Sequence, residues 1–244
     1  MGVRVLLIGD IVGRPGQIVV RALPMLRRQE RLDLVIANAE NAAGGSGLTP
    51  AIYAQLRQAG VDVITLGNHA YRRREILPLL EETDRILRPA NYPPEAPGRP
   101  WTVAETDKGI PVAIFTLLGR LFMPPVDCPL RTADRVRAEL PPQVRVILVD
   151  IHAEATSDKQ LLARYLDGRV SAVLGTHTHV PTADETILPG GTAFQCDIGM
   201  TGPHESIIGR RIDRVLETVR TQRPNHFDVA SQDVRLQGTI VEVD

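Results

Sequence analysis

Residues that commonly bind divalent metals follow five apolar runs of this chain, at the point where each run ends. The runs and the residues after them are VRVLLIG with Asp10, LDLVIANA with Glu40 and Asn41, VDVITLG with Asn68 and His69, VRVILVDI with His152, and VSAVLGT with His177 and His179. These side chains offer oxygen and nitrogen atoms without thiolate, a set that suits manganese, iron or zinc. The sequence therefore predicts a metal site.

The types and spacing of these residues favour two metal ions. His177 and His179 alternate with threonines, so in an extended chain both imidazoles lie on one side and can each reach one ion. Glu40 has two oxygens with which to bridge the ions, and Asn41 and Asn68 would add neutral amide oxygens. Two ions roughly 3.5–4 Å apart clamp phosphoryl oxygens and lower the pKa of a bridging water, so that hydroxide exists near neutral pH.

His69 follows the predicted ligand Asn68 and is not itself needed as a ligand. An imidazole beside metal ions can protonate a leaving alkoxide, a step worth roughly 10²–10⁴-fold in rate. We therefore expect His69 to be the general acid of the site.

An alternating pattern of strands and helices surrounds these residues. Short β-branched runs predict strands at about 3–9, 33–39, 61–66, 144–151 and 170–175, with helices in most of the segments between them. Such alternation predicts parallel βαβ units, whose ligands collect at the carboxyl ends of the strands. Residues 226–243 alternate apolar and polar side chains and are expected to form an antiparallel hairpin. We find no linker and expect one domain, residues 1–244.

The composition limits the partners of the chain. Its 244 residues are 43% hydrophobic with a formal net charge of -1, so no bulk attraction to nucleic acid or anionic membrane is expected. The start lacks a signal-peptide pattern, and no run approaches the roughly 20 apolar residues that span a bilayer. We expect a cytoplasmic protein with a small-molecule phosphodiester substrate and no membrane partner. Nucleic acid is not favoured but not excluded, and a homo-oligomer stays open.

Longer motifs resemble the calcineurin-like metallophosphoesterases. GNH at residues 67–69 matches their GNH motif, and GTHTH at 175–179 approximates their GHxH motif. The chain is more closely similar to the YmdB-type branch of that superfamily, through GDIVGRPG, NAENAAGG, LLGRLFM, DIHAEATSDK and GMTGPHESIIG. The resemblance covers nearly the whole chain. It implies a four-layer α/β/β/α sandwich with mixed sheets and phosphodiesterase activity on cyclic nucleotides.

The resemblance also implies how the ligands divide between two divalent ions. One ion would be held by Asp10, Glu40, Asn41 and His179. The other would be held by Glu40, Asn68, His152 and His177. His69 would be the proton donor, and the ions would be iron or manganese, with zinc tolerated by the same donors.

Three positions depart from the wider superfamily. Val12 stands where the opening DxH motif has its histidine, so that one ion needs another ligand, for which Asn41 is the candidate. Glu40 replaces the usual bridging aspartate. Ala70 follows the GNH motif, where an acidic residue normally orients the catalytic imidazole, so His69 must be oriented or polarised in another way.

The residues and the resemblance together predict a dinuclear metal-dependent phosphodiesterase. It would hydrolyse 2′,3′- or 3′,5′-cyclic monophosphates by attack of a metal-bridging hydroxide. The alternatives are a phosphomonoesterase or RNA-directed nuclease with the same site, and a metal-containing regulatory protein with incidental turnover. Glu154 is expected either to orient His152 or to lie at the surface. Roles for His204 and Arg72–Arg74 stay open.

Overall fold

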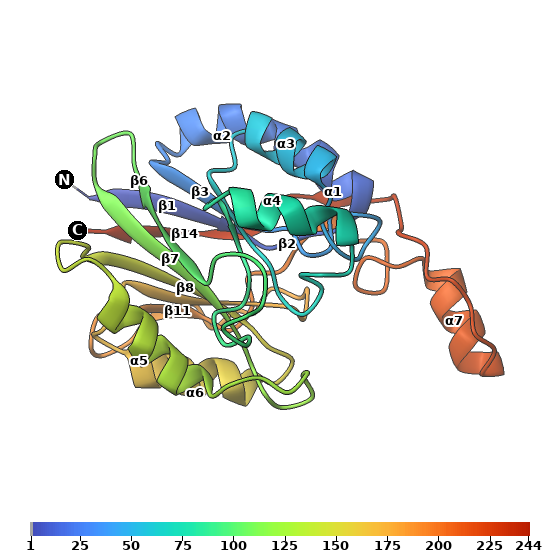
Figure 1. Cartoon of the computed structure of the whole chain (residues 1–244). Helices are drawn as coiled ribbons and strands as arrows, with labels where there is room; N and C mark the ends of the chain where they lie inside the picture. The colour runs from blue at the N-terminus through green and yellow to red at the C-terminus, as the bar shows by residue number, and fades with distance from the viewer. Residues whose placement is uncertain (1) are drawn as a thin grey trace.

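The computed structural model describes residues 2–244 as two β-sheets packed face to face, with helices on both outer faces (Figure 1). This is the α/β/β/α sandwich with mixed sheets that the sequence predicts. Within the described residues no helix is both long and apolar enough to cross a bilayer.

The first sheet carries the amino-terminal half of the site. Its strands, in spatial order, are β14 (Gly238–Val243), β1 (Val3–Ile8), β3 (Leu34–Asn38), β4 (Val63–Thr65) and β5 (Ile86–Leu87). Strands β1, β3, β4 and β5 are parallel, whereas β14 is antiparallel to β1. The outer face is covered by α1 (Gly13–Val19), α2 (Leu23–Gln29), α3 (Pro50–Gln58) and α4 (Leu77–Glu82), with short 3-10 turns η1 (Val20–Ala22) and η2 (Arg74–Ile76) before α2 and α4.

The second sheet carries the later histidines. Its strands, in spatial order, are β10 (Thr186–Ile187), β11 (Ala193–Gln195), β9 (Ala172–Thr176), β8 (Val146–His152), β7 (Pro111–Leu118) and β6 (Trp101–Glu105). The four central strands are parallel, and β6 and β10 are antiparallel edges. The helices α5 (Pro129–Glu139) and α6 (Thr156–Leu166) cover the outer face.

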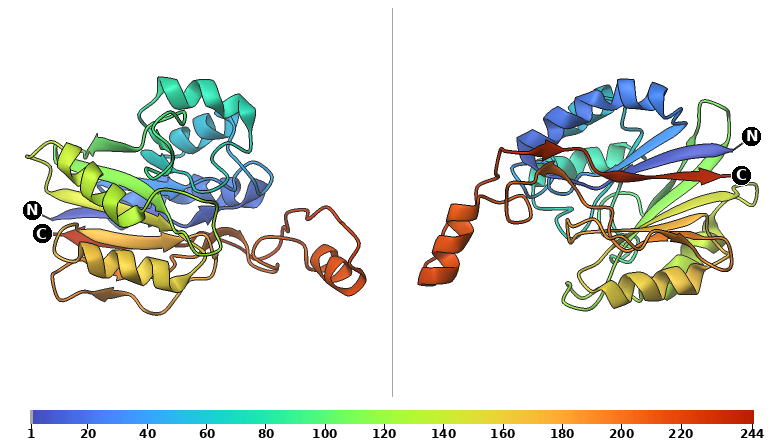
Figure 2. Two further views of the ribbon diagram at one scale, coloured as in Figure 1. Left: turned by 60° about the horizontal axis from the view of Figure 1, so that its bottom comes forward. Right: turned by 180° about the vertical axis from the view of Figure 1, so that it is seen from behind.

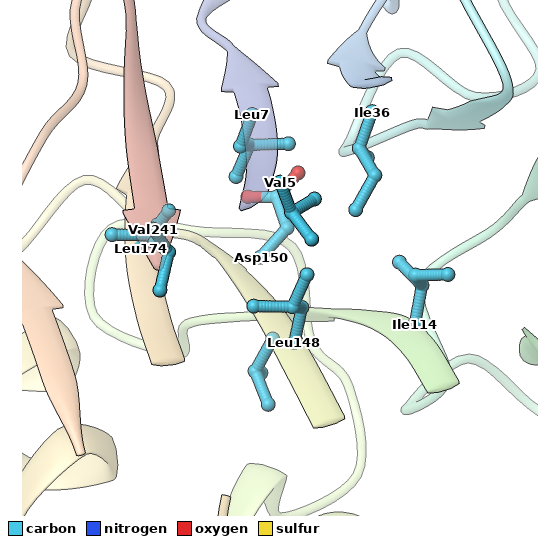
Figure 3. Close-up of a pocket in the computed structure, with 9 residues that line it drawn as sticks. Val5, Leu7, Ile36, Ile114, Leu148, Asp150, Leu174 and Val241 are labelled. Atoms are coloured by element: carbon cyan, nitrogen blue, oxygen red, sulfur yellow. The ribbon is translucent and has the colours of Figure 1, made fainter. Parts of the chain in front are cut away.

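Apolar side chains of the two sheets meet in the middle layer of the sandwich (Figure 3). Val5, Leu7 and Ile36 from the first sheet face Ile114 and Leu148 from the second. The same view shows one carboxylate, that of Asp150, among these apolar groups. Because it is buried between the sheets, Asp150 must find its hydrogen-bond partners inside the protein.

The carboxyl-terminal segment differs from the predicted hairpin. Val234–Arg235 forms β13, which joins β12 (Met200–Pro203) and β2 (Asp10–Ile11) in a small third sheet. Only β14 continues along β1. Period-two alternation marks a half-buried strand but does not identify the strand it pairs with, so the hairpin prediction was wrong. The sequence interpretation also missed helix α7 (Ile212–Thr221), which projects away from the sandwich (Figures 1 and 2).

Candidate metal centre

The structure places all eight predicted site residues at one edge of the two sheets. Asp10 follows β1, Glu40 and Asn41 follow β3, and Asn68 and His69 follow β4. His152 ends β8, and His177 and His179 follow β9. The parallel strands of both sheets end at this edge. Residues far apart in the chain therefore become neighbours, such as Asp10 and His179, which are separated by 169 positions.

One group of donors surrounds His152. Its Nε2 lies 3.2 Å from Glu40 Oε1, 3.1 Å from Asn68 Oδ1 and 3.0 Å from His177 Nδ1. Glu40 and His152 are fully buried, and Glu40 Oε1 has no hydrogen-bond partner. Ring nitrogens of His152 and His69 each lie 3.2 Å from this oxygen, and a cation among these donors would satisfy the buried carboxylate directly. This donor set fits a divalent ion, because the ligand atoms of Glu40, His152 and His177 all lie within 4.8 Å of one another.

A second group of donors lies around Asp10. Its Oδ1 is 3.6 Å from His179 Nε2 and 3.2 Å from Asn41 Nδ2, and Asn41 Nδ2 is 3.3 Å from His179 Nε2. The other ring nitrogen of His179 is 3.0 Å from the Ile208 carbonyl, so Nδ1 donates there and Nε2 is left as an electron-pair donor. The Asn41 amide oxygen faces His69 Nδ1 at 2.8 Å, and its two lone pairs would allow it to accept that hydrogen bond and also to bind an ion.

His152 is oriented by a buried network that the sequence interpretation missed. Its Nδ1 lies 2.9 Å from Thr176 Oγ1, which donates to Asp150 at 2.6 Å. Thr65 and Asn38 also donate to Asp150, at 2.6 and 3.2 Å. Burial raises the pKa of Asp150 although its partners oppose this. The threonine and the carboxylate thus hold the His152 ring so that Nε2 faces the donor group.

Glu154 lies beside His177, although the sequence suggested that it could orient His152. Its Oε2 lies 3.1 Å from His177 Nε2, and its side chain is half-exposed. Glu154 therefore fixes the outer nitrogen of His177 and turns Nδ1 toward His152. Period two placed Glu154 and His152 on one side of a strand, but the strand ends at His152 and the chain turns.

His69 has a polar partner in place of the acidic residue missing at position 70. Its Nδ1 is 2.8 Å from Asn41 Oδ1, its backbone N–H donates to Glu40 Oε2 at 2.8 Å, and Ala70 is buried. Burial lowers the pKa of His69, and the nearby Arg72 adds to this against the attraction of Glu40. The side chain remains 24% exposed, so the imidazole can meet both the site and solvent.

Backbone geometry at the site is tightly constrained. A Cβ atom on Gly67 would overlap the His152 ring and Glu40 Oε2, so the glycine of the GNH motif allows these groups to approach. His177 and His179 have positive φ angles, 93° and 65°, which side-chain-bearing residues rarely adopt. Their loop is held by buried Asp197, which accepts hydrogen bonds from Thr178 N at 3.1 Å and Lys159 Nζ at 2.8 Å.

Neither His204 nor the run Arg72–Arg74 belongs to the two donor groups. Arg73 donates to the carbonyls of Ala43 and Ser46 and so holds the glycine-rich loop after Asn41. Arg72 and Arg74 are exposed. His204 Nε2 lies 3.1 Å from the Met200 carbonyl.

The buried donor residues shift one another's pKa values through their charges. Burial lowers the pKa of His152. The negative charges of Glu40, Asp10 and Asp150 outweigh this effect and raise the pKa to about 9. Burial opposes ionisation of Glu40, yet His152 and His69 keep its pKa lowered. Burial and the charge of His152 lower the pKa of His177 to about 4. In the metal-free protein near pH 7, His152 therefore carries a proton and Glu40 is ionised.

Metal affinity of the stripped protein is therefore expected to rise with pH. A protonated imidazole cannot bind a metal, so an ion must displace the His152 proton, and each pH unit below about 9 costs roughly tenfold in affinity. Glu40 stays ionised throughout, because its pKa is lowered. Titration of Mn²⁺ into chelator-treated protein should show binding roughly 100-fold tighter at pH 8.5 than at pH 6.5. Equal affinities at the two pH values would contradict the placement of His152 at the ion.

Two sheets between helical layers, with candidate Asp, Glu, Asn and His ligands at their common edge, are typical of a metallophosphoesterase architecture. The model of the family described as "YmdB-like protein" matches residues 6–244. The chain belongs to this family, the YmdB branch of the metallophosphoesterases.

Individual relatives agree with this placement. The chain is 43% identical to the 2′,3′-cyclic-nucleotide 2′-phosphodiesterase of Bacillus subtilis (strain 168), over 99% of this chain and 91% of that protein. A hypothetical protein from Thermus thermophilus has a similar crystal structure, with a TM-score of 0.89, 45% identity and coverage of 99% of this chain and 100% of that one. A phosphatase from Mycoplasma pneumoniae superposes with a TM-score of 0.93 at 32% identity, over 100% of this chain and 89% of that one. The chain is accordingly a phosphoric ester hydrolase.

Proposed function

We propose that the protein is a dinuclear metal-dependent phosphodiesterase that hydrolyses cyclic nucleotides. The observation that carries the proposal is Glu40, whose buried Oε1 has no hydrogen-bond partner and lies 3.2 Å from both His152 Nε2 and His69 Nδ1. A carboxylate in that position could serve both donor groups and would hold a cation next to the predicted acid. The name of the Bacillus subtilis relative supports the substrate class.

The two donor groups would hold the two ions. Glu40, Asn68, His152 and His177 would hold one. Asp10, Asn41 and His179 would hold the other, with Glu40 shared. When bound, such ions neutralise phosphoryl charge and supply a water of lowered pKa. Manganese and iron suit this donor set, and zinc is compatible with it.

His69 would deliver the proton that the reaction needs. Asn41 holds Nδ1, which leaves Nε2 for the substrate. Because the lowered pKa of His69 makes the imidazolium a stronger acid, proton transfer to a leaving ribose oxygen is favoured. Water adds to phosphorus, one P–O ester bond breaks, and the released oxygen takes the proton, so that a 2′,3′-cyclic phosphate opens to a nucleoside monophosphate.

The contact between His69 and Asn41 favours an enzyme over a regulatory protein with incidental turnover. Ala70 is the residue that supports the regulatory alternative, since it cannot orient an imidazole. The Asn41 oxygen at 2.8 Å supplies an orienting partner from a neighbouring strand end instead.

The substrate proposal is tested by parallel assays on one metal-loaded preparation. We expect turnover of 2′,3′-cyclic AMP or 3′,5′-cyclic AMP at least about tenfold faster than that of p-nitrophenyl phosphate or single-stranded RNA. Loss of that turnover in Asn68→Ala would assign it to this site and exclude a contaminant. Faster cleavage of the phosphomonoester or of RNA would overturn the substrate class while leaving the metal site intact.

A further inference from the structure

Helix α7 lies apart from the sandwich and has an uncovered apolar face. It projects from the body in all three views (Figures 1 and 2), and none of its ten residues is buried. Ile212, Leu216 and Val219 recur every three or four residues, as on one face of a helix, and are 37%, 49% and 65% exposed. Apolar surface gathered on one exposed helix face is a mark of an interaction site.

The chain covers the opposite, polar face of α7 itself. After Gln222 the chain turns back, and Asn225 donates to Glu217 at 2.8 Å while Asp228 lies 3.7 Å from Arg214. These contacts leave the apolar face free. A groove lined by Val229 and Ala230 runs beside Ile212 and Leu216, which extends the apolar surface at the base of the helix.

The base of α7 is anchored to the rim of the metal centre. Arg210 donates to the carbonyls of Gly44 and Gly45, and to that of Phe227 at 2.9 Å. The Ile208 carbonyl accepts a hydrogen bond from His179. The helix therefore leaves the body in a set direction, and a surface held in place loses less entropy when a partner binds.

The charges along α7 match a second copy of the same helix. Asp213 and Arg220 are seven residues apart, about two turns, so both lie on the same edge of the apolar face. When two identical helices pair in antiparallel orientation, equivalent edges meet, and the Asp213–Arg220 approach occurs twice across the two-fold axis. The exposed Asp213 carboxylate already accepts two hydrogen bonds from Arg211 of its own chain, at 3.0 and 2.7 Å, so Arg220 of the second copy would add to an existing ion pair. The acidic residue is in the first turn and the basic residue in the last, so the helix dipoles also favour this arrangement.

We propose that the apolar face of α7 is a dimer interface, at which two copies of this chain pair their α7 helices in antiparallel orientation. A lipid surface fits the helix less well. The four charged residues of α7, Asp213, Arg214, Glu217 and Arg220, sum to zero, whereas helices that lie on anionic membranes carry an excess of Lys and Arg.

Assembly in solution tests the proposal. At tens of micromolar the wild type should sediment as a dimer of the 26.8 kDa chain, and Leu216→Asp should sediment as a monomer with an unchanged thermal transition of the sandwich, since no residue of α7 is fully buried. A wild-type monomer, or an oligomer that Leu216→Asp leaves intact, would overturn the proposal. A monomer that floats with phosphatidylglycerol vesicles would also overturn the proposal, because the apolar face would then bind a membrane.

Charge reversal tests the antiparallel orientation. Asp213→Arg alone, or Arg220→Asp alone, places like charges opposite each other twice and should weaken the dimer by about tenfold or more. The double variant Asp213→Arg/Arg220→Asp should restore it. A second readout is oxidative cross-linking, expected for Leu216→Cys and absent for Thr221→Cys on the opposite face. No restoration by the double variant, together with no cross-link, would refute the antiparallel pairing.

Discussion

Replacing Glu40 by alanine is expected to lower the rate of hydrolysis roughly 10³-fold and to reduce metal content at both positions. Glu40 is the only predicted ligand shared by the two donor groups, and its carboxylate lies beside His152 and His69. Removing the bridge also leaves His152 without the charge that raises its pKa. Loss of about 4 kcal/mol of transition-state stabilisation, within the several kcal/mol that metal ions supply, corresponds to roughly a 10³-fold lower rate.

Two measurements on Glu40→Ala separate this expectation from simple unfolding. Metal analysis of the purified variant should show less than one equivalent per chain, while circular dichroism should match the wild type. Glu242→Ala is the matched control, because this glutamate is exposed on β14 and forms a surface ion pair with Arg4, away from the donor groups. Two full equivalents of metal in Glu40→Ala would contradict its role as the shared ligand.

His69→Ala is expected to keep its metal ions and lose rate. The imidazole touches Glu40 and Asn41, yet the donors around His152 and Asp10 remain in place without it. Loss of a general acid costs about 10²–10⁴-fold for a poor leaving group such as a ribose alkoxide. An aryl phosphodiester, whose leaving group needs no proton, should lose roughly tenfold or less.

The comparison of leaving groups decides whether His69 acts as an acid. The measurement is kcat for 2′,3′-cyclic AMP and for bis-p-nitrophenyl phosphate in wild type and variant, with metal content determined on the same samples. His226→Ala is the control, since the side chain of that histidine is 88% exposed and lies 3.6 Å from Asp228, outside both donor groups. Equal losses for both substrates would indicate that His69 orients substrate without transferring a proton.

The strand-end pattern of the sequence predicted parallel βαβ units and the grouping of the candidate residues, whereas the four-layer sandwich was predicted from the family resemblance. It succeeded because parallel strands direct their carboxyl ends to one edge, so residues far apart in sequence become neighbours by topology alone. Asp10 and His179, for example, come from different sheets and lie 3.6 Å apart. That these residues bind metal ions remains a prediction.

The parts that the sequence could not predict depend on partners outside each local segment. Asp150 alternates with His152 and could be placed on the same strand, but its hydrogen bonds to Thr65 and Thr176 follow only from packing of the two sheets. The contact between Asn41 and His69 likewise joins two strand ends. Strand β13 joins a third sheet for the same reason, since alternation within a segment does not specify its neighbour.

Helix α7 was missed although its apolar spacing is regular. Arg, Thr and Asn residues surround it, and no residue of the helix is fully buried, so the usual signal of a helix packing on a core is weak. Buried Lys159 was also not foreseen, because a lysine within a helix is usually exposed. Its partner Asp197 lies in a distant loop.

Anomalous diffraction from crystals of protein purified without chelators, measured at the iron, manganese and zinc edges, would locate any bound ions. Two peaks are expected on either side of Glu40, one beside Asp10 and His179 and the other beside His152 and His177. A single peak, or ions bound away from these side chains after reconstitution with each metal, would contradict this expectation.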